Sequence, residues 1–282
     1  MNHDTIEFSL QLQPATARPL GRAGTAARPV GRLHGVRTWT ESPGHAGKRA
    51  FDIAFCALML LCLLGVFAVI ALLIKLDSPG PVFYRVRRVG YRGRPLLMLK
   101  FRKMRDDARG GPLTIDGDPR LTRIGRVLTR TRLDELPQLW DVLRGRMSLI
   151  GPRPEDPGFV ALHHIEYRQI LNVRPGMTGL SQIAYKAEAS IVNADSPVQD
   201  YLSRILPQKL TLDRLYARTA SAGLDLRILY WTFVTVVLRH PVSVNRVNAS
   251  MKLRHRSPEL PPAAAEPVSA LLVSAVPVEA QG

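Results

Sequence analysis

The chain has 282 residues, of which 39 are lysine or arginine and 23 are aspartate or glutamate, giving a formal net charge of +16. This length permits one domain or two small ones, and the 46% hydrophobic content excludes a wholly disordered chain. The excess charge is concentrated in residues 75–146, which carry 18 basic and 8 acidic side chains. Such a segment indicates an anionic partner, for which anionic lipid, a phosphate-bearing ligand and nucleic acid all qualify.

One apolar run dominates the first third of the sequence. Residues 1–47 lack a sustained hydrophobic period and are expected to form a disordered N-terminal tail. Ile53–Ile74 then contains 22 residues without a charge or a proline. As a helix this run is about 33 Å long, enough to cross a hydrocarbon core of about 30 Å. We therefore assign residues 48–75 to a membrane helix and interpret Cys56 and Cys62, both inside it, as apolar filler.

The two flanks of this helix are both basic. Positive flanks are typical of the cytoplasmic side, and a single crossing cannot place both ends there. The helix is therefore either spanning, with the stronger downstream charge deciding its orientation, or re-entrant, entering and leaving by one face. Gly65, near the middle of the run, is a candidate position for the bend.

The region after the apolar run predicts a β-hairpin followed by helices. Residues 81–88 alternate in polarity, and residues 95–102 form a second extended stretch across a glycine-containing turn. The spacing of apolar residues predicts a basic amphipathic helix over 121–131 and a helix over 133–143. The apolar run 228–238 is too short to span a bilayer and is expected to be interfacial or packed.

Asp134 and Glu135 open the predicted helix at 133–143 and are the main candidates for catalysis. Acidic residues at a helix start are usually structural, because they favour the helix dipole. Here arginines precede the pair, and Arg153 follows it between two prolines. One carboxylate could act as a nucleophile and the other could hold a cation, and the surrounding arginines suit a diphosphate substrate.

Other motifs carry less weight. Asp116-Gly117-Asp118 resembles the D-x-D signature of metal-dependent glycosyltransferases, but it is also a common turn sequence. The sequence contains neither a P-loop nor a dinucleotide-binding glycine motif. Aromatic residues make up only 6%, and the basic segment adjoins the apolar run, so we expect anionic lipid rather than nucleic acid as a partner.

Several ordered motifs between Lys48 and Leu238 resemble the bacterial sugar transferases, which act as monotopic polyprenyl-phosphate phosphoglycosyl transferases. They occupy residues 48–52 (KRAFD), 77–83 (DSPGPVF), 100–104 (KFRKM), 118–125 (DPRLTRIG), 133–140 (LDELPQLW), 147–154 (MSLIGPRP) and 174–179 (RPGMTG). The resemblance implies transfer of a sugar 1-phosphate from a UDP-sugar to undecaprenyl phosphate with release of UMP. That reaction begins the assembly of exopolysaccharide or another surface glycan at the bacterial inner membrane, with the catalytic domain on the cytoplasmic face.

The resemblance also implies roles for individual residues. Asp134 matches the nucleophile, and Glu135 matches the second acid, which is linked with Mg²⁺ as the cofactor. Arg153 would hold the phosphate or nucleotide portion. The further candidates for substrate binding are Lys100, Arg102, Arg120 and Arg130. No oligomeric state is implied.

The sequence departs from the family pattern at a few positions. Leu64-Gly65 stands where the family has a Ser-Pro pair that breaks the membrane helix, so a break here would depend on the glycine. Thr129 stands where the family usually has arginine, and Arg146 stands where an acid is usual. These departures bear on the topology and on substrate choice, whereas both acids are retained.

The expected fold class is α+β and mostly helical. It comprises a re-entrant or spanning membrane helix over 48–75, a small membrane-associated catalytic domain over 76–240 with amphipathic helices and a β-hairpin, and a disordered tail over 241–282. Two alternative functions remain open: a non-catalytic, membrane-anchored basic binding module, and a D-x-D glycosyltransferase that releases UDP.

Overall fold

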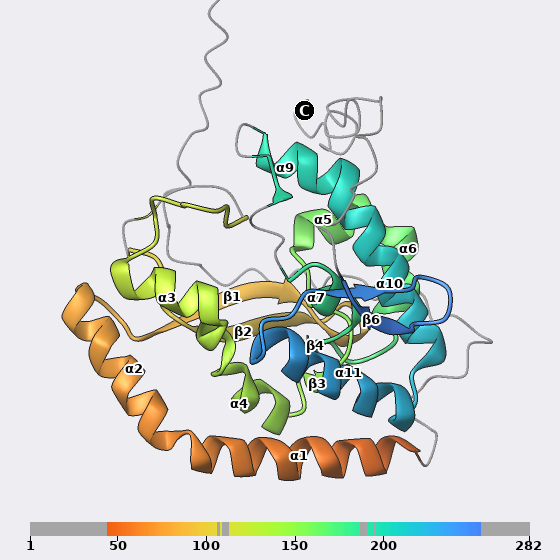
Figure 1. Cartoon of the computed structure of the whole chain (residues 1–282), viewed down its shortest axis with the longest axis horizontal. Coiled ribbons are helices and arrows are strands. Elements are labelled where there is room, and N and C mark those ends of the chain that lie inside the picture. The colour runs from red at the N-terminus through yellow and green to blue at the C-terminus, as the bar shows by residue number, and fades with distance from the viewer. Residues whose placement is uncertain (1–43, 106–107, 109–112, 187–190, 194–195, 255–282) are drawn as a thin grey trace, which may run out of the picture. The chain divides into compact units, whose positions relative to one another are not determined.

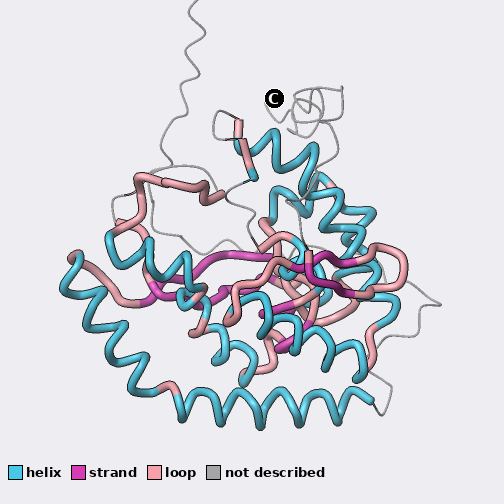
Figure 2. The backbone as a smooth tube through the Cα atoms, viewed as in Figure 1, coloured by secondary structure: helices cyan, strands magenta, loops and turns pink. Residues whose placement is uncertain are grey.

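The structure is a computed structural model that describes residues 44–105, 108, 113–186, 191–193 and 196–254. The chain divides into two units, and the described residues all fall in the second, Thr38–Gly282. Most of the expected N-terminal tail and the end of the expected C-terminal tail lie outside the described residues. Within the described part, helices account for most of the backbone and the strands are short (Figure 2).

The apolar run folds as two helices, α1 (Gly44–Cys62) and α2 (Leu64–Asp77). Leu63 interrupts the helical pattern, with Gly65 following in the first turn of α2. Among the described residues no single helix is long and apolar enough to cross a membrane. The pair Ala46–Cys62 and Leu64–Asp77 meets that length and composition only when taken together, and it is bent by 60° at the break. Figure 1 shows α1 running along one side of the body and α2 turning away from its line.

The expected hairpin is confirmed. Strands β1 (Phe83–Val89) and β2 (Pro95–Phe101) pair antiparallel, with Phe83 opposite Phe101 and Val89 opposite Pro95. The one-turn helix η2 (Tyr91–Gly93) connects them, and Gly93 has a φ of 73°, a left-handed conformation that glycine adopts without steric cost. One face of β2 packs on the main core through Leu96 and Met98, whereas Phe101, on the opposite face, packs with Ile70, Ile74 and Leu128.

The helix expected over 121–131 is also present, as α3 (Arg123–Thr131). Thr122 caps it by accepting a hydrogen bond from Gly125 N at 2.9 Å. The helix expected over 133–143 is instead divided into the 3₁₀ turn η3 (Leu133–Glu135) and α4 (Gln138–Leu143). Pro137 has no N–H to donate, so a regular helix cannot continue through it. The chain between the two elements is held by hydrogen bonds that span three residues instead of four, such as Leu139 N to Leu136 O.

The rest of the body is built from short elements and two longer helices. In chain order they are β3 (Ser148–Ile150), α5 (Pro157–Leu162), α6 (His164–Ile170), β4 (Gly176–Thr178), α7 (Leu180–Ala184), α9 (Pro197–Asp200), the π-helical turn η4 (Tyr201–Ile205), α10 (Leu206–Thr219) and α11 (Ala222–Val236). Strands β3 and β4 pair in parallel. Most of the apolar run 228–238 lies in α11, where Ile228 and Val234 are buried in the main core, so the expectation that it is packed is confirmed for these residues. The α+β, mostly helical fold class is confirmed as well.

Residues 241–254, which the sequence analysis placed in the C-terminal tail, form a hairpin. Strands β5 (Val242–Val244) and β6 (Met251–Leu253) pair antiparallel. Val242 and Met251 are buried and belong to the main hydrophobic core, which explains why this segment is ordered against the body. The folded part of the chain therefore continues to Leu253, beyond the expected boundary at 240.

The first helix is attached to the body by polar contacts from its N-terminal half. Lys48 Nζ lies 2.6 Å from Asp225 Oδ2 on α11, and Ser148 Oγ donates to Asp52 Oδ2 at 2.7 Å. Arg49 donates to the carbonyl oxygens of Val142 and Leu143 at 2.6 and 2.8 Å. These carbonyl groups at the C-terminal end of α4 would otherwise lack a hydrogen-bond partner within the helix. We call Lys48, Arg49 and Asp52 the α1 clamp.

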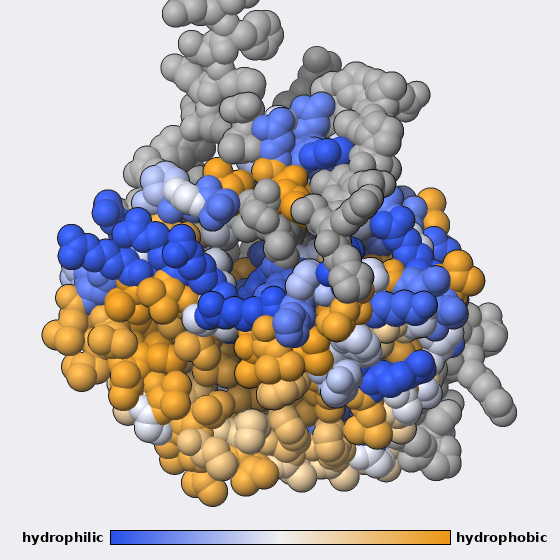
Figure 3. All heavy atoms as spheres, viewed as in Figure 1, coloured by the Kyte–Doolittle hydropathy of each residue, from blue (hydrophilic) through white to orange (hydrophobic). Residues whose placement is uncertain are grey.

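The outer surface of α1 and α2 is apolar. Leu58, Leu61, Leu64, Leu72 and Leu76 are each more than half exposed. Figure 3 shows hydrophobic residues gathered over the region of α1 and α2, with hydrophilic residues concentrated above them. Such a large exposed apolar surface is characteristic of an interaction site for a membrane or another protein.

Candidate active site

The acid pair lies in a sharp turn between α3 and α4. Arg132 ends α3 with a φ of 62°, in the left-handed region that residues other than glycine seldom occupy, and η3 follows at once. Asp134 is only 2% exposed. Backbone strain of this kind often occurs at functional sites, because the surrounding contacts must maintain it.

Three cations surround Glu135. Its Oε1 atom lies 2.9 Å from Lys100 Nζ, 2.8 Å from Arg153 Nη2 and 4.0 Å from Arg132 Nη1. Burial alone would raise the pKa of this carboxyl group, but the three cations hold the pKa well below its ordinary value. Glu135 is therefore ionised at neutral pH and fixes the directions of three basic side chains.

Asp134 has a different cation beside it. Lys103 Nζ lies 3.7 Å from Asp134 Oδ2, and burial lowers the pKa of this lysine, although the neighbouring carboxylate opposes the shift. The segment carrying Lys103 is held by α3, since Thr122 N donates to Lys103 O at 3.1 Å. A Cβ atom on Gly125 would lie 1.8 Å from that same carbonyl oxygen, so only glycine permits this approach.

A cavity of about 1160 Å³ lies beside the acid pair. Glu135 and Lys103 line it, whereas Asp134 lies behind them, 3.7 Å from Lys103, and is not part of the lining. The basic side chains on its wall are Arg87, Arg88, Lys100, Arg102, Lys103, Arg105, Arg120, Arg126, Arg130, Arg132, Arg153, Lys186 and Lys209. Such a concentration of cations in a partly enclosed space favours a multiply charged anion.

Arg153 reaches Glu135 because two glycine-containing segments pack closely. Gly151 follows the last residue of β3, and Gly176 is the first residue of β4. A Cβ atom on Gly176 would lie 2.1 Å from Gly151 N. Gly176 N donates to Pro152 O at 2.8 Å, which fixes the residue before Arg153. The two segments form one rigid support for the arginine, although they are about 25 residues apart in the sequence.

The other predicted binding residues occupy different places. Arg102 is 5% exposed and donates to Ser78 O at 2.7 Å and to Pro79 O, so it fastens the segment that follows α2. Arg120 pairs with Asp118 at 2.6 Å and donates to Leu113 O. Arg130 is exposed on the cavity wall. The structure thus brings Lys100 and Arg153 together at Glu135, whereas Arg102 and Arg120 are engaged elsewhere.

The Asp116-Gly117-Asp118 segment forms a turn. Gly117 has a φ of 71°, and Asp118 is 3% exposed, with its carboxylate bound to the Arg120 side chain at 2.6 to 3.2 Å. Hydrogen bonds from Arg120 are the main reason that the pKa of Asp118 is lowered. This engagement favours a structural role for Asp118 over that of a metal ligand.

The two departures from the family pattern are accommodated by local contacts. Thr129 lines the cavity, and its hydroxyl donates to Gly125 O in its own helix at 2.8 Å. Arg146 lies 3.7 Å from Asp141 Oδ1, and Asp141 accepts from Leu99 N at 2.9 Å. Arg146 therefore compensates a buried carboxylate, away from the acid pair.

Comparison with known proteins identifies the family. Residues 44–239 match the family described as "Bacterial sugar transferase". The chain belongs to this family. The match covers every residue discussed above in the acid pair, its cations and the α1 clamp.

Three relatives of this bacterial sugar transferase illustrate the range of names in the family. The "Exopolysaccharide production protein PSS" of Rhizobium leguminosarum bv. phaseoli is 40% identical over 202 residues, which are 68% of this chain and 96% of the relative. The "Undecaprenyl-phosphate glucose phosphotransferase" of Komagataeibacter xylinus is 41% identical over 194 residues, 66% of this chain and 35% of the relative. The "UDP-N-acetylgalactosamine-undecaprenyl-phosphate N-acetylgalactosaminephosphotransferase" of Aeromonas hydrophila is 38% identical over 197 residues, 67% of this chain and 43% of the relative. The matched region thus spans less than half the length of the latter two.

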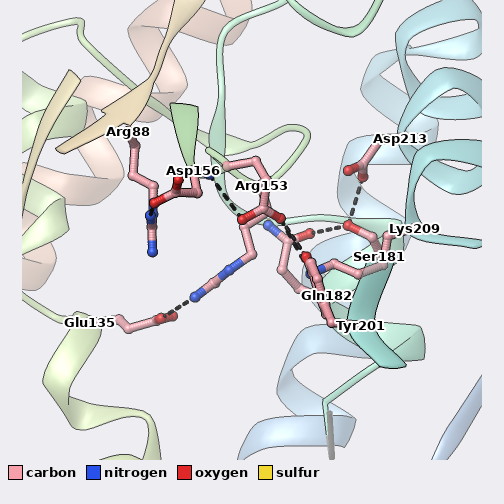
Figure 4. A network of polar contacts seen from close by, with 10 residues as sticks. Arg88, Glu135, Arg153, Asp156, Ser181, Gln182, Tyr201, Lys209 and Asp213 are labelled. Carbon is pink, nitrogen blue, oxygen red and sulfur yellow. Dashed lines mark hydrogen bonds and ion pairs between the residues drawn. The ribbon is translucent and has the colours of Figure 1, made fainter. Parts of the chain in front are cut away.

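Sequence reasoning missed part of the site of this sugar transferase. Lys103 lies in a motif that the family resemblance used, but its proximity to Asp134 follows only from the packing of α3 against the end of the hairpin. Figure 4 shows a further group of polar side chains beyond Arg153 that had not been anticipated. Its members come from a loop and from separate helices, and they carry no local motif.

Proposed function

We propose that the chain transfers a sugar 1-phosphate from a UDP-sugar to undecaprenyl phosphate and releases UMP, as the first membrane step in the assembly of exopolysaccharide or another surface glycan. The observation that carries the proposal is the position of Glu135, held between Lys100 at 2.9 Å and Arg153 at 2.8 Å next to Asp134 and beneath a cationic cavity. A carboxylate can attack a phosphate only where the negative charges are neutralised, and this site supplies that neutralisation.

The reaction would proceed in two displacements. An Asp134 carboxylate oxygen attacks the β-phosphorus of the donor, and the bond from that phosphorus to the bridging oxygen breaks, so that UMP leaves with the electron pair. An oxygen of undecaprenyl phosphate then attacks the same phosphorus, and Asp134 leaves as a carboxylate. Arg153 and Lys100 would bind the donor phosphates, while Lys103 would stabilise the Asp134 carboxylate before attack and after release.

Magnesium is proposed as the cofactor, with Glu135 as its protein ligand. Among the described residues no group of three or more His, Cys, Asp or Glu side chains is placed to hold a metal ion. The three ion pairs of Glu135 all involve Oε1, whereas Arg120 engages both carboxylate oxygens of Asp118. Mg²⁺ often binds through one or two carboxylates together with substrate phosphates, so Glu135 beside a phosphate site fits this mode. The bound ion would withdraw charge from the transferred phosphate.

The exposed apolar face of α1 and α2 is proposed to sit in the inner membrane with the cavity on the cytoplasmic side. The bend of 60° and the basic residues on both flanks support a re-entrant pair, whose two ends return to one face. Single cysteines introduced at Lys48 and at Ser78, in a Cys56→Ala/Cys62→Ala background, should both react with an impermeant thiol reagent only from the cytoplasmic side. Labelling of one position from the periplasm would indicate a spanning helix instead.

The activity itself is tested by product analysis. The purified chain, supplied with Mg²⁺, undecaprenyl phosphate and either UDP-glucose or UDP-N-acetylgalactosamine, should release UMP, and Asp134→Asn should abolish this release. Asp116→Asn is the matched control, because the same change in the turn at 116–118 should leave UMP release intact. Undiminished turnover by Asp134→Asn would refute the assigned nucleophile.

The two alternatives predict different products. A D-x-D glycosyltransferase would release UDP and would lose activity in Asp116→Asn. A non-catalytic basic module would bind anionic ligands in a salt-sensitive manner without turnover, and its binding would survive loss of both acids. Arg120's engagement of Asp118 speaks against the first alternative.

A further inference from the structure

The side of the cavity beyond Arg153 differs chemically from the side that holds the acid pair. Five polar residues form it, and we call them the neutral wall: Glu155, Ser181, Gln182, Tyr201 and Lys209. They come from the loop after Arg153, from α7, from the π-helical turn η4 and from α10. Figure 4 shows Arg153 between Glu135 on one side and this group on the other.

The charges within the neutral wall cancel. Lys209 Nζ lies 3.7 Å from Glu155 Oε2 and donates to Tyr201 Oη at 2.8 Å, and that hydroxyl donates to Glu155 Oε2 at 2.6 Å. Lys209 is only 4% exposed and also lies over the Tyr201 ring. One buried cation and one buried anion thus compensate each other, whereas the acid-pair side carries an excess of cations. The π-helical turn that starts at Tyr201 is of a kind often found at functional sites.

The Gln182 amide is oriented with its nitrogen unsatisfied. Its Oε1 atom lies 3.1 Å from Ser181 Oγ, which is also 2.6 Å from Asp213 Oδ1. The Ser181 hydroxyl has one proton, so it donates to Gln182 Oε1 when Asp213, whose pKa burial raises to about 7, is protonated and donates to Ser181 Oγ in turn. In that state the oxygen end of the amide lies on this side. Gln182 Nε2 is buried and finds no hydrogen-bond partner among the residues that the structure describes, although the residue lines the cavity. Buried polar atoms are nearly always paired, so an unpaired donor at a cavity indicates a missing acceptor.

We propose that the neutral wall binds the uncharged, hydroxyl- and amide-bearing portion of the donor, and that Gln182 Nε2 donates a hydrogen bond to an oxygen of that portion. The inference rests on the proposed function. A nucleotide sugar has a diphosphate centre flanked by two uncharged polar ends, the sugar and the nucleoside. With the diphosphate at Arg153 and Lys100, one uncharged end of the donor reaches the neutral wall. An uncharged group is not attracted by an additional cation, so hydrogen-bond donors and acceptors provide the selectivity there.

Binding to a chain that cannot react provides the test. In the full-length Asp134→Asn background, titration calorimetry with Mg²⁺ present should give a dissociation constant for UDP-glucose that is about tenfold higher when Gln182→Leu is added, as expected for loss of one hydrogen bond in a buried site. The matched control is Gln169→Leu, since Gln169 is exposed on α6 and accepts from Arg218 at 2.9 Å, outside the cavity. This control should change the constant less than twofold.

Two further ligands identify which end of the donor is bound. If the nucleoside lies at the neutral wall, Gln182→Leu weakens UMP by the same factor as UDP-glucose. If the sugar lies there, UMP is unaffected and the preference between UDP-glucose and UDP-N-acetylgalactosamine changes. Either result supports the inference, and pyrophosphate binding should be unchanged in both.

The failures are distinguishable. Unchanged binding of UDP-glucose, UDP-N-acetylgalactosamine and UMP by the Gln182→Leu protein would overturn the inference alone. An equal loss for pyrophosphate would also overturn it, because the cluster would then serve the phosphates or the fold. If the Asp134→Asn chain bound neither UDP-sugar, the proposed function would be contradicted together with the inference.

Discussion

Lys103 and Asp134 form the contact nearest to the proposed chemistry, with Nζ and Oδ2 3.7 Å apart and the carboxylate side chain only 3% exposed. The two residues come from different elements, the end of the hairpin and the turn η3. Their approach requires the tight packing of Gly125 against Lys103 O. The cation therefore offsets a buried carboxylate that would otherwise be unfavourable in the fold.

Replacing Lys103 should reduce turnover strongly. We expect Lys103→Met to lower kcat for UMP release by about a hundredfold, because the Asp134 carboxylate loses its neighbouring cation in a poorly solvated site. Lys103→Arg should recover part of the loss. Lys252→Met, on the exposed side of β6, is the control and should retain wild-type kcat. More than half of wild-type kcat in Lys103→Met would show that the contact is not used in catalysis.

Glu135 should remain ionised throughout the working pH range. Its folded-state pKa lies below its ordinary value, so its ion pairs add stability that is present above about pH 4 and is lost as the pH falls through the folded-state pKa. Glu135→Gln should lower kcat. It should also reduce the decrease in unfolding free energy between pH 7 and pH 3, measured by denaturant unfolding. The acid limb of the pH–rate profile above pH 5 should keep its position in this variant. A shift of that limb would mean that Glu135 titrates there.

Asp213 should make stability depend on pH in the opposite sense. Burial raises its pKa to about 7, against the opposing effects of the Ser181 hydroxyl and Lys209. The folded state then holds the proton more tightly than the unfolded chain, so stability declines from about pH 4 to pH 7 and levels off above that. Asp213→Asn should remove this decline, which amounts to about 3 kcal/mol between pH 5 and pH 8. Parallel stability profiles for the wild type and the variant would contradict the assignment.

The glycine contact behind Arg153 should be intolerant of a methyl group. Gly176→Ala would bring its Cβ within 2.1 Å of Gly151 N and 2.6 Å of Gly151 Cα, and we expect a loss of about 3 kcal/mol in unfolding free energy with a raised KM for the donor. Gly65→Ala is the comparison, because nothing lies within 4 Å of its Cβ position. That change should be neutral or stabilising by up to about 1 kcal/mol. Equal effects of the two substitutions would show that the close approach is not rigid.

The elements that sequence analysis predicted well are those determined by local patterns. The alternation around residues 83–101 and the periodicity of residues 123–131 depend on neighbours a few positions away, and both elements are present. The α1–α2 break lies at Leu63, whereas the sequence pointed to Gly65, because an apolar run gives no local mark of where a helix ends. Strands of three residues, such as β3 and β4, are too short to leave a pattern.

The candidate site was predictable only in part, for a related reason. The motifs identified the acid pair, Lys100 and Arg153, and the structure brings these together. Arg102 resembled the others by residue type, but its partners are the backbone oxygens of Ser78 and Pro79, which composition cannot reveal. The neutral wall was missed because its contacts join residues far apart in the sequence: Glu155 and Tyr201 are 46 positions apart, and Ser181 lies 32 positions from its partner Asp213.

The α1 clamp has a geometric consequence for the proposed reaction. Lys48, Arg49 and Asp52 fasten the first helix to α11, α4 and β3, so the helix is a rigid extension of the body and cannot swing as a loose tether. A bilayer that takes up the apolar face of α1 and α2 would hold the cavity at a fixed height. The enzyme would then select its acceptor by position as well as by chemical structure. Only a lipid phosphate held at that height above the hydrocarbon core would reach the cavity.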